Sequence, residues 1–187
     1  MTRKAISPAV AEGQAETRPP VLSFIGPSGS GKTTMLERLV PILKELGHRV
    51  AIIKHVHHKG FELDTPGKDS YRLTQAGADI VLLSSPERIA LLEETPREWD
   101  LPQLLTLVHN RADLVLTEGY RGRDAPQIAV GGLPPDVEDP LAAGIVAIIS
   151  DAPLSSPLPR FGFGEAEALA RWLGRFCDLT ANDDRAQ

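Results

Sequence analysis

Residues 26–33 read Gly26-Pro27-Ser28-Gly29-Ser30-Gly31-Lys32-Thr33, with the spacing G-x-x-x-x-G-K-T. The apolar run 21–25 precedes this stretch, and the amphipathic segment 34–46 follows it. A strand, a glycine-rich loop and a helix in this order are the context in which such a sequence binds phosphate. We therefore predict that residues 26–33, called the phosphate loop below, bind the phosphates of a nucleotide.

The residue types of the phosphate loop suit this chemistry. Glycines adopt backbone angles closed to other residues and let the main chain approach a phosphate closely. Successive N–H groups then form an anion nest at the positive end of the following helix. Lys32 can reach the β- and γ-phosphates, and the Thr33 hydroxyl can bind the Mg²⁺ that bridges them. The predicted nucleotide-binding residues here are Gly26, Pro27, Ser28, Gly29, Ser30, Gly31, Lys32, Thr33 and Thr34.

Length and composition favour one globular domain. A chain of 187 residues, 42% of them hydrophobic, is long enough for one α/β domain and too short for two of ordinary size. We expect a disordered tail over residues 1–19, a single nucleotide-binding domain over residues 20–178 and a flexible tail over residues 179–187. Cys177 is the only cysteine, which fits a reducing cytoplasm, and we interpret it as a core residue.

The charge of the chain bears on its partners. The formal net charge of −5 argues against a surface for nucleic acid or for an anionic membrane, where a basic excess is expected. No run approaches the roughly 18 to 20 apolar residues that span a bilayer. We expect neither nucleic acid nor a membrane as a partner.

The order of the predicted elements indicates the fold class. Apolar runs predict further strands at 50–53, 80–83, 89–92, 113–117, 127–130 and 145–149, and helical spacing recurs at 101–109 and 165–177. This pattern predicts an α/β fold, a P-loop NTPase-like three-layer α/β/α arrangement with a mostly parallel central sheet. The continuous run 50–53 is typical of a strand buried on both faces.

Two strand ends carry candidate ligand-binding residues. Ligands of open α/β sheets bind at the carboxyl ends of the strands. Glu118 ends the run 113–117, so we predict that it contacts Mg²⁺ or its water. After the run 50–53 come His55, His57 and His58, which could contact an anion or ligand, bind a transition metal or lie in a solvated loop.

Two further acidic residues are candidates for the metal site. Asp64-x-x-Gly67 resembles the D-x-x-G switch sequence of small GTPases, although it does not directly follow an apolar strand. Asp64 and Asp69 either lie near the metal or serve as turn and cap residues. The predicted catalytic residues are Lys32, Glu118 and Asp64, and the predicted metal ligands are Thr33, Asp64 and Glu118.

Two other features are given structural interpretations. The segment 110–113, Asn-Arg-Ala-Asp, evokes the guanine-reading N-K-x-D sequence, but it precedes its strand, so we reject it as a base reader. The local motifs therefore do not predict whether the bound nucleotide carries guanine or adenine. Trp99 we interpret as a packing residue, because large aromatic side chains mostly serve as buried area.

Taken together, these motifs resemble those of the MobB family of molybdopterin guanine dinucleotide biosynthesis proteins. The resemblance covers the chain from Val21 to the C-terminal helix. It rests on the phosphate loop, Lys54-His55-x-His57-His58, Asp64-x-Pro66-Gly67-Lys68-Asp69-Ser70, Gly77-Ala78 and the strand that ends in Glu118-Gly119.

The resemblance implies a homodimeric adapter that binds GTP and Mg²⁺ and is at most a weak GTPase. It implies that the partner is the molybdenum cofactor guanylyltransferase, which attaches GMP to molybdopterin, and that molybdopterin is met through that enzyme. On this reading His55, His57 and His58 border the nucleotide together with Asp69. The alternatives are a small-molecule kinase that uses ATP and a non-catalytic, nucleotide-dependent scaffold.

Overall fold

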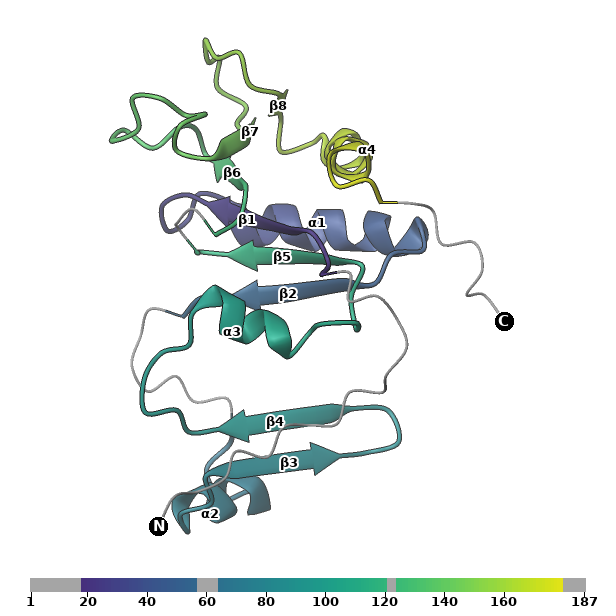
Figure 1. Ribbon diagram of the computed structural model, residues 1–187, viewed down its shortest axis with the longest axis vertical. Coiled ribbons are helices and arrows are strands. Elements are labelled where there is room, and N and C mark those ends of the chain that lie inside the picture. The colour runs from purple at the N-terminus through teal and green to yellow at the C-terminus, as the bar shows by residue number, and fades with distance from the viewer. Residues whose placement is uncertain (1–17, 57–63, 121–123, 180–187) are drawn as a thin grey trace.

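The structure, a computed structural model, describes residues 18–56, 64–120 and 124–179. Its main body is built on a six-stranded sheet in which every neighbouring pair of strands is parallel (Figure 1). In spatial order the strands are β2 (Val50–Lys54), β5 (Leu114–Glu118), β1 (Val21–Ile25), β6 (Gln127–Val130), β7 (Ile145–Ile149) and β8 (Arg160–Phe161). Since β1 lies between β5 and β6, the carboxyl ends of these two strands flank the phosphate loop.

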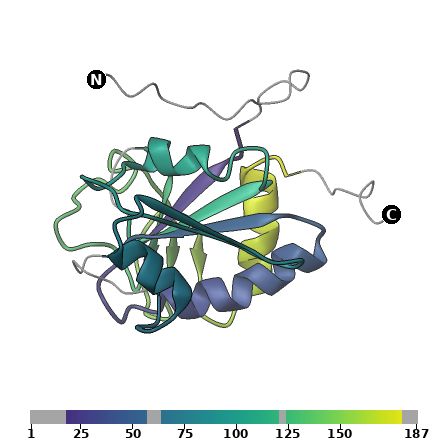
Figure 2. The ribbon, with the colours of Figure 1, turned by 90° about the horizontal axis from the view of Figure 1, so that it is seen from below.

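Helices cover both faces of this sheet, which gives the predicted three layers. Helices α1 (Lys32–Glu45) and α4 (Ala166–Phe176) pack against each other on one face. Helix α3 (Leu101–Thr106) lies on the opposite face, as the two views in Figures 1 and 2 show. The predicted α/β/α fold with a mostly parallel sheet is confirmed.

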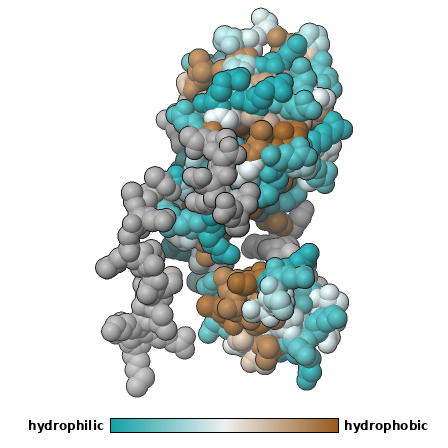
Figure 3. Space-filling model, turned by 90° about the vertical axis from the view of Figure 1, so that its right-hand side faces the viewer, coloured by the Kyte–Doolittle hydropathy of each residue, from teal (hydrophilic) through white to brown (hydrophobic). Residues whose placement is uncertain are grey.

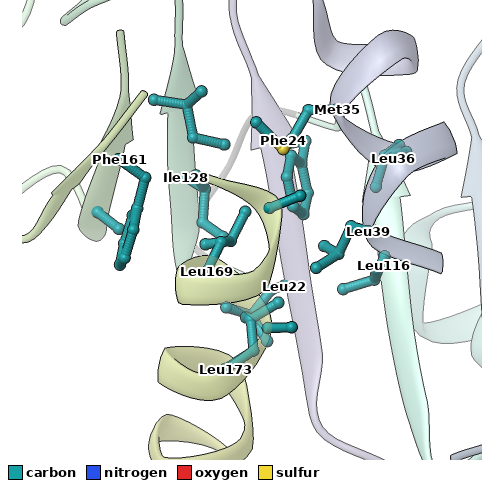
Figure 4. Packing of buried hydrophobic residues seen from close by; sticks show 14 of the residues in the cluster. Leu22, Phe24, Met35, Leu36, Leu39, Leu116, Ile128, Phe161, Leu169 and Leu173 are labelled. Atoms are coloured by element: carbon teal, nitrogen blue, oxygen red, sulfur yellow. The ribbon is translucent and has the colours of Figure 1, made fainter. Parts of the chain in front are cut away.

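The core lies between the sheet and the α1–α4 layer (Figure 4). Apolar residues recur on one face of each helix, so their side chains meet those of the central strands. The buried residues of this cluster include Leu22 and Phe24 of β1, Met35 and Leu39 of α1, and Leu169 and Leu173 of α4. Their packing fixes the start of α1, and with it the phosphate loop, against the sheet.

A second, smaller sheet consists of β3 (Ile80–Ser84) and β4 (Ile89–Glu93), an antiparallel hairpin that pairs with no strand of the main sheet. Helix α2 (Asp69–Gln75) packs against β3. Both strands were expected from the apolar runs 80–83 and 89–92. The pairing register places Ile80, Leu82, Ile89 and Leu91 on one face, here called the hairpin face, and all four side chains are exposed.

Two details differ from the expectations. Strand β2 was expected to be buried on both faces, but it is an edge strand, and Ile52 is 44% exposed. An edge strand has neighbouring side chains on one side only, so its own side chains are less covered than those of a central strand. Strand β8 was not expected, because its two residues are too few to show a periodicity.

Among the helices of the described residues, none combines the length and the apolar character that a bilayer crossing requires.

Candidate functional site

The phosphate loop is held closely on the β6 side of the sheet. Gly26, Gly29 and Gly31 have φ angles of 152°, 74° and 91°, which side chains disfavour. A Cβ atom on Gly26 would lie 2.4 Å from the carbonyl oxygen of Val130, and one on Gly31 would lie 2.6 Å from the ring of Phe163. The loop therefore needs glycine for its close approach to its neighbours as well as for its backbone angles.

The start of α1 is available to an anion. Gly31 occupies the N-cap position and supplies no side-chain cap, and the first turn holds no acidic residue. The N–H groups of this turn therefore lack side-chain acceptors. The Lys32 ammonium donates hydrogen bonds to the carbonyl oxygens of Gly26 and Pro27, at 3.0 and 2.7 Å. A phosphate bound in the loop would offer this ammonium a charged acceptor in their place.

Three residues from three elements meet beside the loop and form what we call the Glu118 cluster. Thr33 Oγ1 donates a hydrogen bond of 2.8 Å to Glu118 Oε1. The same carboxylate oxygen lies 3.2 Å from Lys54 Nζ, which is also 3.4 Å from Thr33 Oγ1. Glu118 is only 8% exposed. A hydroxyl and a carboxylate are oxygen ligands suited to Mg²⁺, so the residues present fit the predicted metal site.

Lys54 is a site residue that was not predicted. It ends β2, and the parallel register pairs it with Glu118 at the end of β5. The available signal was its place directly after the apolar run 50–53. Because that signal says nothing about which strand lies next to β2, the ion pair could not be inferred from it.

His55 contacts two further side chains next to the Glu118 cluster. Its Nε2 pairs with the carboxylate of Glu98, and its ring centroid lies 5.2 Å from that of Tyr120. Burial, with the nearby charge of Glu98, raises the pKa of Tyr120 above its ordinary value. His57 and His58 lie outside the described residues. Within 18–56, 64–120 and 124–179, no group of three or more His, Cys, Asp or Glu side chains is arranged to hold a metal ion.

The loop, the Glu118 cluster and His55 border a hollow of about 1200 Å³. All the predicted residues from Gly26 to Thr34 line it. Its far wall comes from Glu98, Trp99 and Tyr120. Asp100 caps α3 with a capping box to Gln103, which brings this wall to the hollow. Trp99 thus borders the candidate site, which the packing interpretation did not predict.

The structure does not bring Asp64 and Asp69 to this hollow. Asp64 Oδ1 accepts a hydrogen bond from Thr65 N, and its Oδ2 is buried without a partner among the described residues. Asp69 begins α2 and lies 3.5 Å from Arg72. Their roles at the metal remain predictions.

The segment 110–113 lies away from the site, as expected. Asp113 immediately precedes β5 and forms an ion pair of 2.7 Å with Arg49, which precedes β2. These residues are at the amino ends of their strands, whereas Lys54 and Glu118 are at the carboxyl ends. The rejection of this segment as a base reader agrees with its position.

Comparison with known proteins connects this architecture to one family. The family described as MobB, molybdopterin guanine dinucleotide synthesis protein B, matches residues 21–151. The chain belongs to the MobB family. Among MobB relatives, the molybdopterin-guanine dinucleotide biosynthesis adapter protein of Escherichia coli K12 is 37% identical over 162 residues, 83% of this chain and 91% of the relative. A probable adapter protein of Bacillus subtilis is 34% identical over 133 residues, 70% and 75% of the two chains.

Solved MobB structures share the fold. A crystal structure of molybdopterin-guanine biosynthesis protein B superposes with a TM-score of 0.67 at 31% identity, over 84% of this chain and 99% of that chain. Bacillus subtilis MobB gives 0.65 at 28% identity, over 83% and 97%. These structures, the relatives and the family match confirm the resemblance found in the motifs. The region that matches the MobB family runs from β1 to just past β7, and β8, Phe163 and α4 follow it in the chain.

Proposed function

We propose that this chain is a GTP-binding adapter of molybdopterin guanine dinucleotide biosynthesis. In this role it binds Mg²⁺ and assists the molybdenum cofactor guanylyltransferase, which attaches GMP to molybdopterin. The observation that carries the proposal is the Glu118 cluster beside an uncapped helix start, within a chain of the MobB family. The Escherichia coli relative named as an adapter supports the biological role.

The residues of the site have distinct roles in this proposal. The N–H groups of the phosphate loop and the Lys32 ammonium bind phosphate oxygens. Thr33 and Glu118 would hold Mg²⁺, which neutralises phosphate charge when bound. Lys54 now neutralises Glu118 at 3.2 Å, and its half-exposed ammonium is free to turn toward a phosphate instead.

Hydrolysis is expected to be slow. Among the described residues that line the hollow there is no arginine to stabilise charge on a transferring phosphoryl group. P-loop GTPases that lack such a group turn over on the order of 10⁻⁴ to 10⁻³ per second. We propose, as the family resemblance implies, that the chain is at most a weak GTPase and acts mainly through binding.

A second candidate function is a small-molecule kinase that uses ATP. The observation that favours it is the size of the hollow, about 1200 Å³, which extends past the Glu118 cluster to Trp99 and Tyr120. This space could admit a phosphoryl acceptor. It could equally admit part of a partner or its pterin, so base preference and phosphoryl transfer separate the two functions.

Calorimetric titration with Mg·GTP and Mg·ATP tests the proposal. We expect a preference for GTP, and loss of measurable triphosphate affinity in Lys32→Ala with the fold intact. Lys44→Ala is the matched control, because this lysine is exposed in the last turn of the same helix. In parallel, pull-down of the guanylyltransferase and its product yield test the adapter role. A preference for ATP with phosphoryl transfer to a small acceptor would support the kinase and overturn the proposal.

We also propose that the chain forms a homodimer through the hairpin face. Leu82 and Ile89 there are 62% and 66% exposed, and apolar residues gather on this part of the molecule (Figure 3). Large apolar patches of this kind commonly mark interaction sites. Leu82→Lys should give monomers in light scattering, whereas Leu141→Lys, at another exposed leucine, should not. A Leu82→Lys protein with an unchanged dimer fraction would contradict this interface.

A further inference from the structure

The position of the Glu118 cluster indicates on which side of the phosphate loop the nucleoside of a bound nucleotide would lie. This inference rests on the proposed function, namely that the phosphate loop binds a nucleoside triphosphate. Thr33 and Glu118 lie on the β5 side of the loop. A Mg²⁺ ion held by these two residues would neutralise the terminal phosphates, so we place these phosphates on that side. The nucleoside then extends to the opposite side, toward the ends of β6, β7 and β8.

The segments that follow two strands, β6 and β8, lie against the loop on that side. A Cβ atom on Gly131, directly after β6, would lie 3.1 Å from the side chain of Ser30. Phe163, shortly after β8, lies beside Gly31. Between them, β7 is followed by Ser150 and Asp151. The carboxyl ends of parallel strands are where open α/β sheets bind their ligands.

Asp151 presents a fixed carboxylate at this edge. Its Oδ1 accepts a hydrogen bond of 2.9 Å from the backbone N–H of Phe163. A Cβ atom on Gly162 would lie 2.9 Å from the same oxygen, so glycine at that position leaves room for the carboxylate. Asp151 is exposed, and the described residues donate no hydrogen bond to its second oxygen, Oδ2. The carboxylate is thus held in place while one oxygen stays open to a ligand.

We propose that Asp151 is the residue that selects guanine. An ionised carboxylate only accepts hydrogen bonds, and guanine offers two adjacent donors, N1–H and the N2 amino group. Adenine offers an acceptor, N1, at the same edge, so it would leave the carboxylate unpaired. A site built to bond such donors strongly rejects an analogue that lacks them. Phe163 links this carboxylate to the loop, since its backbone N–H binds Asp151 and its half-buried ring lies beside Gly31. The ring would offer the nucleoside an apolar wall.

Exchanging the carboxylate of Asp151 for an amide, and guanine for xanthine, tests this assignment. Asp151→Asn replaces one carboxylate oxygen, an acceptor, by an amide NH₂ group, a donor. The variant protein should therefore bind xanthine, which has a carbonyl oxygen in place of the N2 amino group of guanine. We expect the affinity for Mg·GTP to fall about tenfold to a hundredfold, and the affinity for Mg·XTP, the xanthosine triphosphate, to rise by a similar factor. Affinity for Mg·tripolyphosphate should stay unchanged, because it has no base.

Two further variants separate recognition from folding. Asp178→Asn is the matched control, since this exposed aspartate lies just past the other end of α4 and should leave all three affinities unchanged. Gly162→Ala keeps the charge of Asp151 but displaces its carboxylate, so the ratio of GTP to ATP affinity should fall with tripolyphosphate binding retained. Circular dichroism and the melting temperature establish that each variant is folded.

The outcomes distinguish this inference from the proposed function. If the unaltered chain binds neither Mg·GTP nor tripolyphosphate, the proposed function fails. If it prefers GTP and Asp151→Asn keeps both that preference and its weak XTP binding, the assignment of Asp151 is overturned. The nucleobase would then lie elsewhere, and a loss of GTP preference in Trp99→Ala would place it across the hollow.

Discussion

At the end of β5, Glu118 holds a nearly buried charge between Thr33 and Lys54. Glu118→Gln keeps the size of this side chain but removes the charge that favours a cation. We expect the affinity for Mg²⁺ to fall roughly tenfold to a hundredfold, as is typical when a metal site loses one of its supporting groups. The measurement is nucleotide titration with Mg²⁺ and with EDTA.

A nearby variant controls for this change. Glu98→Gln alters a carboxylate on the far wall of the hollow, which contacts His55 and neither Thr33 nor Lys54. It should leave the Mg²⁺ dependence of binding unaltered. Equal Mg²⁺ dependence in Glu118→Gln and in the unaltered chain would remove Glu118 from the metal site.

Cys177 gives a prediction about pH. It lies at the C-cap of α4, packed against the core, and burial together with the charge of Asp178 raises its pKa from 9.0 to about 11. The neutral thiol is therefore favoured by folding, and this stabilisation is complete below about pH 9 and is lost as the pH rises toward 11. The rate of alkylation should show its midpoint near pH 11 in the folded protein and near 9 in guanidinium chloride. A native midpoint near 9 would mean that the thiol is not buried as described.

Single residues of the site differ in how far the sequence could predict them. The position of Lys32 and Thr33 at the hollow was predictable because they belong to a contiguous motif, and that of Glu118 because it ends a clear apolar run. Lys54 reaches Glu118 only through pairing of β2 with β5, and Asp151 meets the Phe163 N–H only through the turn after β8. Such contacts depend on strand order, which residue spacing does not encode.

Among the elements, the turn from the phosphate loop into α1 needs glycine for two reasons. One is a positive φ angle, and the other is the lack of room for a Cβ atom. Gly29 and Gly31 both have positive φ angles, 74° and 91°, but only Gly31 has a neighbour, Phe163, where a Cβ atom would be. Gly29→Ala should destabilise the fold by about 1 to 2 kcal/mol through backbone strain alone. Gly31→Ala should cost about 1 to 3 kcal/mol more, because the Phe163 ring must move.

Urea unfolding of the two variants without nucleotide measures this difference. Gly164→Ala is a suitable control, since a Cβ atom there would meet no neighbour within 4 Å. If Gly29→Ala and Gly31→Ala unfold with the same free energy, Phe163 does not support the loop.

The central strands could be predicted as elements because their apolar runs are continuous. The two misjudged strands, β2 and β8, lie at the two edges of the sheet. Burial at an edge depends on what covers it, and a two-residue strand exists only because β7 offers it a partner. Neither condition is visible in a local pattern.

For the whole molecule, the division into two sheets predicts which strands are protected from hydrogen exchange when nucleotide binds. On the proposed function, Mg·GTP would contact the ends of β1 and β5, which pair within the main sheet. In the described residues β3 and β4 pair only with each other. Opening of the hairpin is thus separate from opening of the main sheet. Hydrogen exchange should slow in β1, β5 and β6 on adding Mg·GTP and stay unchanged in β3 and β4. Equal slowing in both sheets would show that they open together.

Sequence patterns predicted the three layers of the molecule but not this division. The runs 80–83 and 89–92 identify strands, yet their alternation does not say with which sheet they pair. The exposure of the hairpin face also depends on what it packs against, and that is a property of the assembled molecule.

The contact between Phe163 and Gly31 has a consequence for biosynthesis of the chain. The ribosome synthesises residues 26–33 well before Phe163, whose ring lies beside Gly31. A nascent chain therefore displays the motif long before its support exists, and nucleotide cannot guide the first stages of folding. Chains truncated before Phe163 should then bind nucleotide more weakly than the full chain.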